Sequence, residues 1–339
     1  MAKGERLDWV DTGRGLAISL VALFHATNWI AATRLDVSMW ADLSTVVSSL
    51  RMPFFFALAG LFAGKWLHAT WGEVVRSKVL LFLWVLVVWT VIGMVVQLSG
   101  MRAAGEPVNL AAAARDTLLS PVIPRFELWF IWALAVFFLV AKATRRVPPL
   151  VQLAAAGIMS AIGLTVWLNT TTGLTGSAKF YFFFLCGLYL RALLLRIASA
   201  RVWMLAAVVV VWAVVSTVLF VLDLRAVPGA YFVNCLLGVA AGVAISRALV
   251  RLPLLQRLGR QTLPIYLAHT PIIIALSIVL LLVPGLLDIV APIGWLIPPL
   301  AAVAGVAGAL WLHARLRGTP LRYLYEPIPA AVRVLGGRG

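Results

Sequence analysis

Long apolar runs, separated by short polar stretches, constrain this chain more than any other feature of its sequence. A helix crosses a bilayer with roughly 17–25 mostly apolar residues, and many runs here reach that length. The sequence therefore predicts an all-α, polytopic membrane protein with about ten transmembrane helices. The predicted spans lie near residues 14–32, 44–64, 79–99, 127–141, 150–168, 180–197, 202–221, 230–249, 264–283 and 294–313.

The composition leaves little room for a soluble domain. Hydrophobic residues make up 63% of the chain and charged residues 12%, whereas soluble domains average roughly 45–50% and about 25%. The longest connection, residues 100–126, is too short for an independent core but long enough for a short surface helix. We therefore expect residues 1–339 to form a single membrane-embedded domain.

Two further features exclude other classes of segment. The first apolar run is interrupted by His25 and Asn28 and is followed by no small-residue cleavage site, so we interpret it as a retained helix and not a signal peptide. The two cysteines, Cys186 and Cys235, each lie inside an apolar run. This spacing predicts buried free thiols and neither a disulfide framework nor a metal site.

The distribution of Lys and Arg predicts the orientation, because short cytoplasmic loops are enriched in these residues. With the amino terminus inside, most basic residues lie on the inner side, and we expect both termini to be cytoplasmic. The net charge of +16 then reflects this bias and an anionic inner leaflet, and no nucleic-acid partner is expected. The basic residues predicted outside are Arg34, Arg102, Arg115, Arg125, Lys179 and Arg225.

Arg14 and His25 are ionisable residues on the first predicted span. Such residues are costly in a bilayer and therefore mark functional sites. Eleven residues make about three helical turns, which places both side chains on one face about 16 Å apart. Arg14 would lie at the cytoplasmic surface, as a ligand-binding residue or as an ordinary topological anchor. His25 would lie near mid-bilayer, where it can exchange protons near neutral pH.

Neighbours of this pair are expected to support it. Asp11, one turn before Arg14, could orient the arginine. Gly13 and Gly15 would allow an anionic ligand to approach backbone amides near the helix start. Asn28, one turn beyond His25, is a candidate for substrate binding.

Polar groups at the outer ends of other spans predict an outward-facing vestibule. Arg51 is followed by Pro53, which suggests a broken helix whose freed carbonyl groups line a cavity. Glu127 and Lys179 open two further spans at a similar depth. Because several ionisable groups at one depth seldom all face lipid, we expect Arg51, Glu127 and Lys179 to bind substrate.

The ninth span carries a second polar group near the inner surface. Tyr266 and His269 are three residues apart and share a helix face, and Arg260 precedes them. We expect these three residues near the cytoplasmic ligand.

Three motifs in this order resemble acyltransferase family 3. They are Arg14 and His25 with ten residues between them, the stretch Arg51-Met52-Pro53-Phe54-Phe55-Phe56, and the stretch Ile265-Tyr266-Leu267-Ala268-His269. The resemblance covers about residues 6–271. A serine that is common in the family is replaced here by Ala59, and no extra lumenal domain is expected.

The resemblance implies a bacterial inner-membrane O-acyltransferase. Such enzymes move acetyl or related groups, usually from cytoplasmic acyl-CoA, to hydroxyls of surface glycans or glycolipids. Arg14 would then hold the anionic head of acetyl-CoA, and His25 would deprotonate the acceptor hydroxyl or carry the acyl group first; we prefer the direct route. No metal is expected.

A transporter or flippase of a sugar or lipid is the alternative, since it could use the same buried His, Arg and Glu residues. Transporters usually contain paired broken helices in inverted repeats. Only one such break, at Pro53, is suggested by this sequence, which favours the enzyme.

Overall fold

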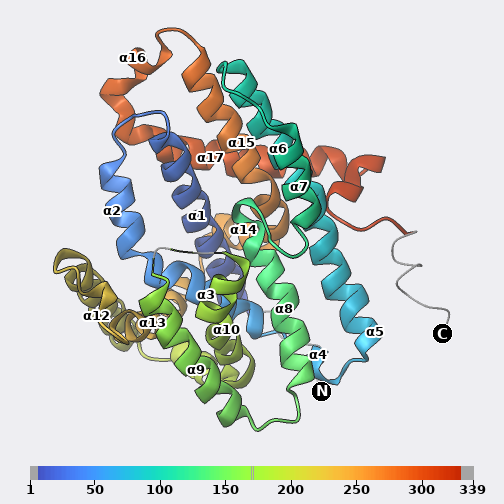
Figure 1. Ribbon diagram of the computed structural model, residues 1–339. Coiled ribbons are helices and arrows are strands. Elements are labelled where there is room, and N and C mark those ends of the chain that lie inside the picture. The colour runs from blue at the N-terminus through green and yellow to red at the C-terminus, as the bar shows by residue number, and fades with distance from the viewer. Residues whose placement is uncertain (1–6, 169, 171, 330–339) are drawn as a thin grey trace. The chain divides into compact units, whose positions relative to one another are not determined.

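The computed structural model describes residues 7–168, 170 and 172–329, and these residues form helices and no strands (Figure 1). This arrangement is expected in lipid, where a helix satisfies its backbone polar groups internally. The basic residues Lys3, Arg6, Arg333 and Arg338, which contribute to the predicted orientation, lie outside the described residues.

The chain divides into two compact units. Residues 1–20, 44–68 and 140–262 form the first unit, and residues 21–43, 69–139 and 263–339 form the second. Four helices contribute to both units, namely α1 (Asp8–Ala31), α2 (Ser38–Val46), α8 (Trp129–Ala143) and, with its first residue only, α15 (Thr262–Leu282). The expectation of a single domain stays a prediction.

The first unit is built around α3. This helix packs against α10 and α13, and α12 packs on α13. Aromatic side chains fill the contact between α3 and α10, where the ring centroids of Phe56 and Phe180 are 5.7 Å apart. The helices of this unit are α3 (Ser48–Gly60), α4 (Gly64–His68), α9 (Pro149–Val166), α10 (Gly173–Tyr189), α11 (Arg191–Ala198), α12 (Val202–Val221), η3 (Leu224–Ala226), α13 (Ala230–Ala248) and α14 (Pro253–Arg260).

The second unit holds the latter half of α1 against α15 and α17. Its apolar core includes Ala22, Ala26 and Ile30 of α1, Ile273 of α15 and Ala301 of α17. The helices of this unit are α5 (Trp71–Val74), η1 (Val75–Val79), α6 (Leu80–Ala103), α7 (Leu110–Leu119), η2 (Phe126–Leu128), α15 (Thr262–Leu282), α16 (Leu286–Val290), η4 (Ala291–Leu296), α17 (Ile297–Leu316) and η5 (Pro320–Leu324). The short helix expected between residues 100 and 126 is α7.

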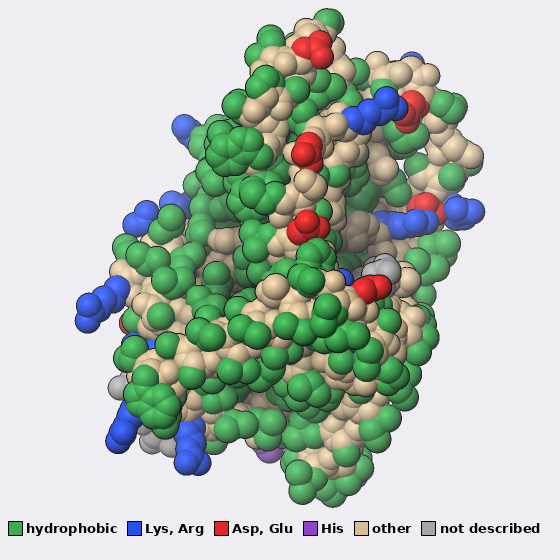
Figure 2. Space-filling model, turned by 90° about the vertical axis from the view of Figure 1, so that its left-hand side faces the viewer, with side chains coloured by type: hydrophobic (Ala, Val, Ile, Leu, Met, Phe, Trp, Pro, Cys, Tyr) green, Lys and Arg blue, Asp and Glu red, His purple; other side chains and the backbone are tan. Residues whose placement is uncertain are grey.

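The protein is a multi-pass membrane protein. In the described part of the chain, 7 helical stretches are long and apolar enough to span a bilayer, or up to 9 if each of two bent pairs is one span. The helix α1 is not among them, because Arg14, His25 and Asn28 lower its hydropathy. The number of ten spans and the cytoplasmic termini therefore stay predictions. Figure 2 shows hydrophobic side chains over broad areas of one face, with few acidic side chains between them.

Several helices differ in their limits or bends from the predicted spans. The second span is bent by 51° between α2 and α3, at Val47, whereas Pro53 lies inside the continuous helix α3. The predicted sixth span crosses a bend of 76° between α10 and α11. The helix α1 begins at Asp8, so that Arg14 lies almost two turns inside it. Cys186 and Cys235 are buried free thiols, as predicted.

Candidate active site

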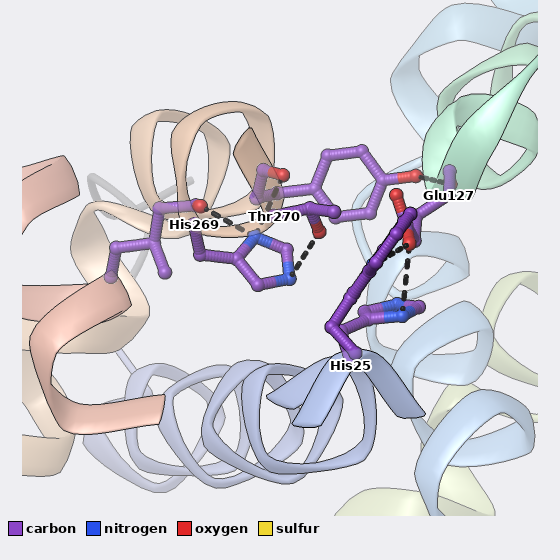
Figure 3. A network of polar contacts seen from close by, with 7 residues as sticks. His25, Glu127, His269 and Thr270 are labelled. Atoms are coloured by element: carbon purple, nitrogen blue, oxygen red, sulfur yellow. Dashed lines mark hydrogen bonds and ion pairs between the residues drawn. The ribbon is translucent and has the colours of Figure 1, made fainter. Parts of the chain in front are cut away.

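His25 and Glu127 meet inside the second unit. His25 projects from the latter half of α1, and Glu127 lies in the short 3-10 turn η2 before α8. The Nδ1 atom of His25 is 3.2 Å from Oε1 of Glu127, and the two side chains are 13% and 15% exposed (Figure 3). Trp29, one turn along α1, donates its indole N–H to the same oxygen at 3.5 Å. Two donors from one helix thus converge on one carboxylate oxygen.

This contact defines how the His25 imidazole is protonated. A carboxylate is a hydrogen-bond acceptor, so the Nδ1 atom facing Glu127 carries the hydrogen. In the neutral imidazole, Nε2 then holds the lone pair and is the basic nitrogen. A carboxylate on the opposite nitrogen also stabilises the imidazolium that forms when Nε2 takes a proton, as in serine-protease triads.

His269 lies beside His25 but is held by its own helix. The two ring centroids are 5.5 Å apart. The Nδ1 atom of His269 is 2.9 Å from the backbone carbonyls of Ile265 and Tyr266, and carbonyls only accept, so Nδ1 donates (Figure 3). Nε2 is therefore the acceptor, and the Thr270 hydroxyl, 3.3 Å away, donates to it. Both ring nitrogens of His269 thus have hydrogen-bond partners, and the side chain is fully buried. His269 is therefore placed to hold the side chains around it in position.

Tyr266 and Phe126 fix the turn that carries Glu127. The Tyr266 hydroxyl donates to the backbone carbonyl of Glu127. Phe126 has a φ of 53°, in the left-handed region that is unfavourable for a residue with a side chain. Its ring packs on Gly93 of α6, where an added Cβ would lie 2.9 Å from the ring. The tyrosine and the glycine together hold a strained backbone conformation directly before Glu127.

A narrow pocket adjoins this turn. Its volume of about 10 Å³ is enough for roughly one water. The lining combines the polar groups of Glu127, Tyr266 and Thr270 with apolar side chains from α6 and α15, chiefly Trp89 and Ile274.

Arg14, Asp11 and Arg260 lie in the first unit. The guanidinium of half-buried Arg14 is 4.9 Å from the ring centroid of Phe62. The carboxylate of Asp11 is 3.2 Å from Nε of Arg260, an ion pair that the sequence did not predict. The structure therefore brings all three predicted residues to one unit, and the expectation that Asp11 orients Arg14 stays a prediction.

The glycines beside Arg14 have a packing role. An added Cβ on Gly15 would lie 2.0 Å from the carbonyl oxygen of Leu255 in α14, and one on Gly259 would lie 1.7 Å from that of Asp11. Gly13 is enclosed by Ser246, Phe54 and Leu58. The expectation that Gly13 and Gly15 open the backbone to a ligand was wrong, because other helices already occupy that space.

The remaining predicted residues are divided between the units. Asn28 is exposed on α1, one turn beyond His25. Arg51 and Lys179 are buried in the first unit, where Arg51 donates to the Ser44 hydroxyl at 2.9 Å and Lys179 to the Thr170 carbonyl at 2.5 Å. Glu127 belongs to the second unit, so the structure does not gather the predicted acceptor residues into one unit.

Sequence reasoning missed Trp29 and Phe126. Trp29 could have been found, because it is four residues after His25 and so on the same helix face. Nothing in the sequence marks Phe126, whose backbone conformation depends on its contact with α6. Within residues 7–168, 170 and 172–329, no group of three His, Cys, Asp or Glu side chains is arranged to hold a metal ion.

Comparison with known families decides the class of protein. The family model of the acyltransferase domain, acyltransferase family 3, matches residues 7–314, nearly the whole chain. The chain belongs to this family. No curated protein and no solved structure matches it. This member of acyltransferase family 3 is therefore a membrane-embedded acyltransferase, and the matched region includes every candidate site residue described above.

Proposed function

We propose that this acyltransferase moves an acetyl group from cytoplasmic acetyl-CoA to a hydroxyl of a cell-envelope or exported glycan or glycolipid, in a bacterial inner membrane. Membership of the family supports acyl transfer. The observation that carries the assignment of roles is the contact between His25 and Glu127, since it combines a base with a carboxylate that orients it.

His25 is the general base in this proposal. Its Nε2 takes the proton of the acceptor hydroxyl as the oxygen attacks the thioester carbonyl. The carbon–sulfur bond then breaks, and the imidazolium returns the proton to the departing CoA thiolate. General-base catalysis of this kind typically contributes about 10²–10⁴-fold to a rate. Direct attack is preferred to an acyl-histidine because an acyl-histidine would need a second residue to activate the acceptor for its resolution.

Glu127 is assigned to positioning in place of the predicted acceptor binding. Its carboxylate fixes the His25 tautomer, and Trp29 holds that carboxylate. Tyr266 and His269, expected at the CoA side, are likewise assigned to positioning. Tyr266 tethers the backbone of Glu127, and His269 packs beside the His25 ring.

The donor is assigned to the cationic start of α1. Arg14 is half-buried and lies in the same unit as the Asp11–Arg260 pair. A guanidinium suits this role because its planar fork matches phosphate oxygens in a bidentate fashion. Asn28, Arg51 and Lys179 remain proposed contacts of the acceptor.

The decisive experiment measures acetyl transfer by the purified protein in detergent. Wild type should release or transfer radiolabelled acetyl groups from acetyl-CoA, and His25→Ala should lower this rate by about 10²–10⁴-fold. His68→Ala, at an exposed histidine of α4, is the matched control and should retain the wild-type rate. Full activity of His25→Ala would exclude the mechanism.

The acceptor is tested in cells. Mass spectrometry of envelope glycans and glycolipids should show one species that loses the mass of an acetyl group when His25→Ala replaces the wild type. Identical spectra would argue against an envelope acceptor.

A further inference from the structure

Basic side chains gather at the end of the first unit where α3, α10 and α13 begin. Arg51 lies in the first turn of α3, Lys179 in the second turn of α10, and Arg225 in η3 just before α13. Arg51 and Lys179 are only 7% and 2% exposed. We call Arg51, Lys179 and Arg225 the cationic cluster.

Tyr231 connects the members of this cluster. The Arg225 guanidinium lies 4.8 Å from the centroid of the Tyr231 ring. The Tyr231 hydroxyl is 2.6 Å from the Ser48 hydroxyl, which is one turn before Arg51 on α3. Lys179 is close enough to Arg225 for their charges to repel each other. The three cations therefore form one connected group within a single unit.

The helix ends add further positive potential. The helices α3 and α13 begin at Val47 and Gly229 without a side-chain cap. Uncapped N–H groups and the helix dipole both favour an anion at such an end. They add to the positive charges of the cationic cluster, in which Lys179 and Arg225 repel each other.

Arg225 offers an unused donor to such an anion. Its Nε atom is buried and, within the described residues, has no hydrogen-bond partner. Buried polar atoms of this kind usually have a partner, so this N–H is available to an anion. Among the acidic residues of the first unit, Asp223 is the nearest in the sequence to Arg225, and its side chain is exposed.

We propose that the cationic cluster binds a phosphate-type oxyanion. A dianionic phosphate balances three cations better than a single carboxylate does, and its several oxygens can accept from Arg and Lys together. The phosphate could belong to a lipid headgroup or to a soluble molecule. This inference rests on the proposed function in one respect, because Arg51 and Lys179 are also proposed contacts of the acceptor, whereas none of the three cations belongs to the His25–Glu127 contact.

The test measures anion binding by the full-length protein in the absence of acyl-CoA. The thermal unfolding midpoint is recorded in detergent against increasing inorganic phosphate, with chloride holding the ionic strength constant. A second arm uses nanodiscs of phosphatidylcholine with and without phosphatidic acid. Arg225→Gln and Lys179→Met are the test variants, and Arg191→Gln, at an exposed arginine of α11, is the matched control.

We expect wild type, His25→Ala and Arg191→Gln to be stabilised in a saturable manner, and both test variants to bind at least about tenfold more weakly. Stabilisation by phosphatidic acid alone would identify a lipid headgroup, and stabilisation by inorganic phosphate would identify a soluble ligand. The proposal is overturned if neither anion stabilises wild type, or if the variants respond as wild type does. Arg225 is half-buried, so its variant remains informative if Lys179→Met fails to fold.

Discussion

The two halves of α1 hold their polar residues in opposite ways. In the first half, Arg14 is half-buried against an aromatic ring, and the nearby carboxylate of Asp11 pairs with Arg260. In the second half, His25 faces a carboxylate that Trp29 also contacts. The short helical turn that carries this carboxylate is itself held by a hydrogen bond from Tyr266.

This difference assigns donor binding to the first half of α1 and the chemical step to its second half. A cation that binds a ligand can adapt to it, whereas a base must be oriented before the substrate arrives. Changes around His25 should therefore lower kcat, and changes at Arg14 should raise the KM for acyl-CoA. Beyond the loss of activity in His25→Ala, three substitutions test this separation, and a fourth tests the stability of the loop that leads to Glu127.

Glu127→Gln should have the largest effect of these four. The amide can no longer stabilise the imidazolium, and it can present an N–H that favours the wrong His25 tautomer. We expect kcat to fall on the order of 10²-fold, with the KM for acetyl-CoA unchanged. Glu106→Gln, in an exposed loop of the same unit, is the control. An equal rise in KM would place Glu127 in donor binding.

Arg14→Lys should show the opposite pattern. Lysine keeps the charge but loses the bidentate fork, so the KM for acetyl-CoA should rise about tenfold while kcat changes little. Steady-state kinetics in detergent measure both quantities, with Arg251→Lys as the exposed control. An unchanged KM would assign Arg14 to membrane topology alone.

Gly93→Ala tests the turn before Glu127. The new methyl group would displace the Phe126 ring and shift the carboxylate, so kcat should fall by a few-fold at an unchanged KM. In Gly72→Ala the added methyl meets nothing within 4 Å, which makes it the matched control. Equal kinetics of the two variants would show that the Phe126 contact does not position Glu127.

Asp116→Asn should have the smallest effect, through the loop that leads to Glu127. Partial burial would raise the pKa of Asp116, but hydrogen bonds from Arg115 and Arg125 outweigh it and lower this pKa. A carboxyl group whose pKa is lowered in the folded protein stabilises the fold at pH values above its pKa in the unfolded chain, which is about 3.9. This stabilisation is lost as the pH falls through the lower pKa of the folded protein. The variant should unfold at a slightly lower temperature than wild type at pH 7, and the difference should shrink as the pH falls below about 4. A constant difference across this range would exclude the ion pairs as its cause.

The sequence predicted the helical membrane class and singled out His25, because both follow from local patterns. Apolar runs define helices wherever they pack, and a histidine in such a run is unusual in any fold. The partner of His25 was not predictable in the same way. Glu127 is 98 positions from Trp29, its other contact on α1, and only packing of the second unit brings them together.

Other failures have a similar origin. Pro53 was expected to break a helix, but it lies inside the continuous helix α3, and the bend is at Val47, before that helix begins. Gly15 was interpreted as access for a ligand, whereas the approach of α14 explains it. Arg225 was counted only as an outer charge, since the sequence could not place it beside Lys179.

The contact of α1 with α14 has a mechanical consequence. Gly15 and Gly259 each meet a backbone carbonyl so closely that neither position has room for a methyl group. The two helices therefore cannot slide past each other without a collision between main chains. The relative position of Asp11 and Arg260 is therefore fixed before any donor binds. Side chains such as Arg14 are the part of this region that adapts to the donor.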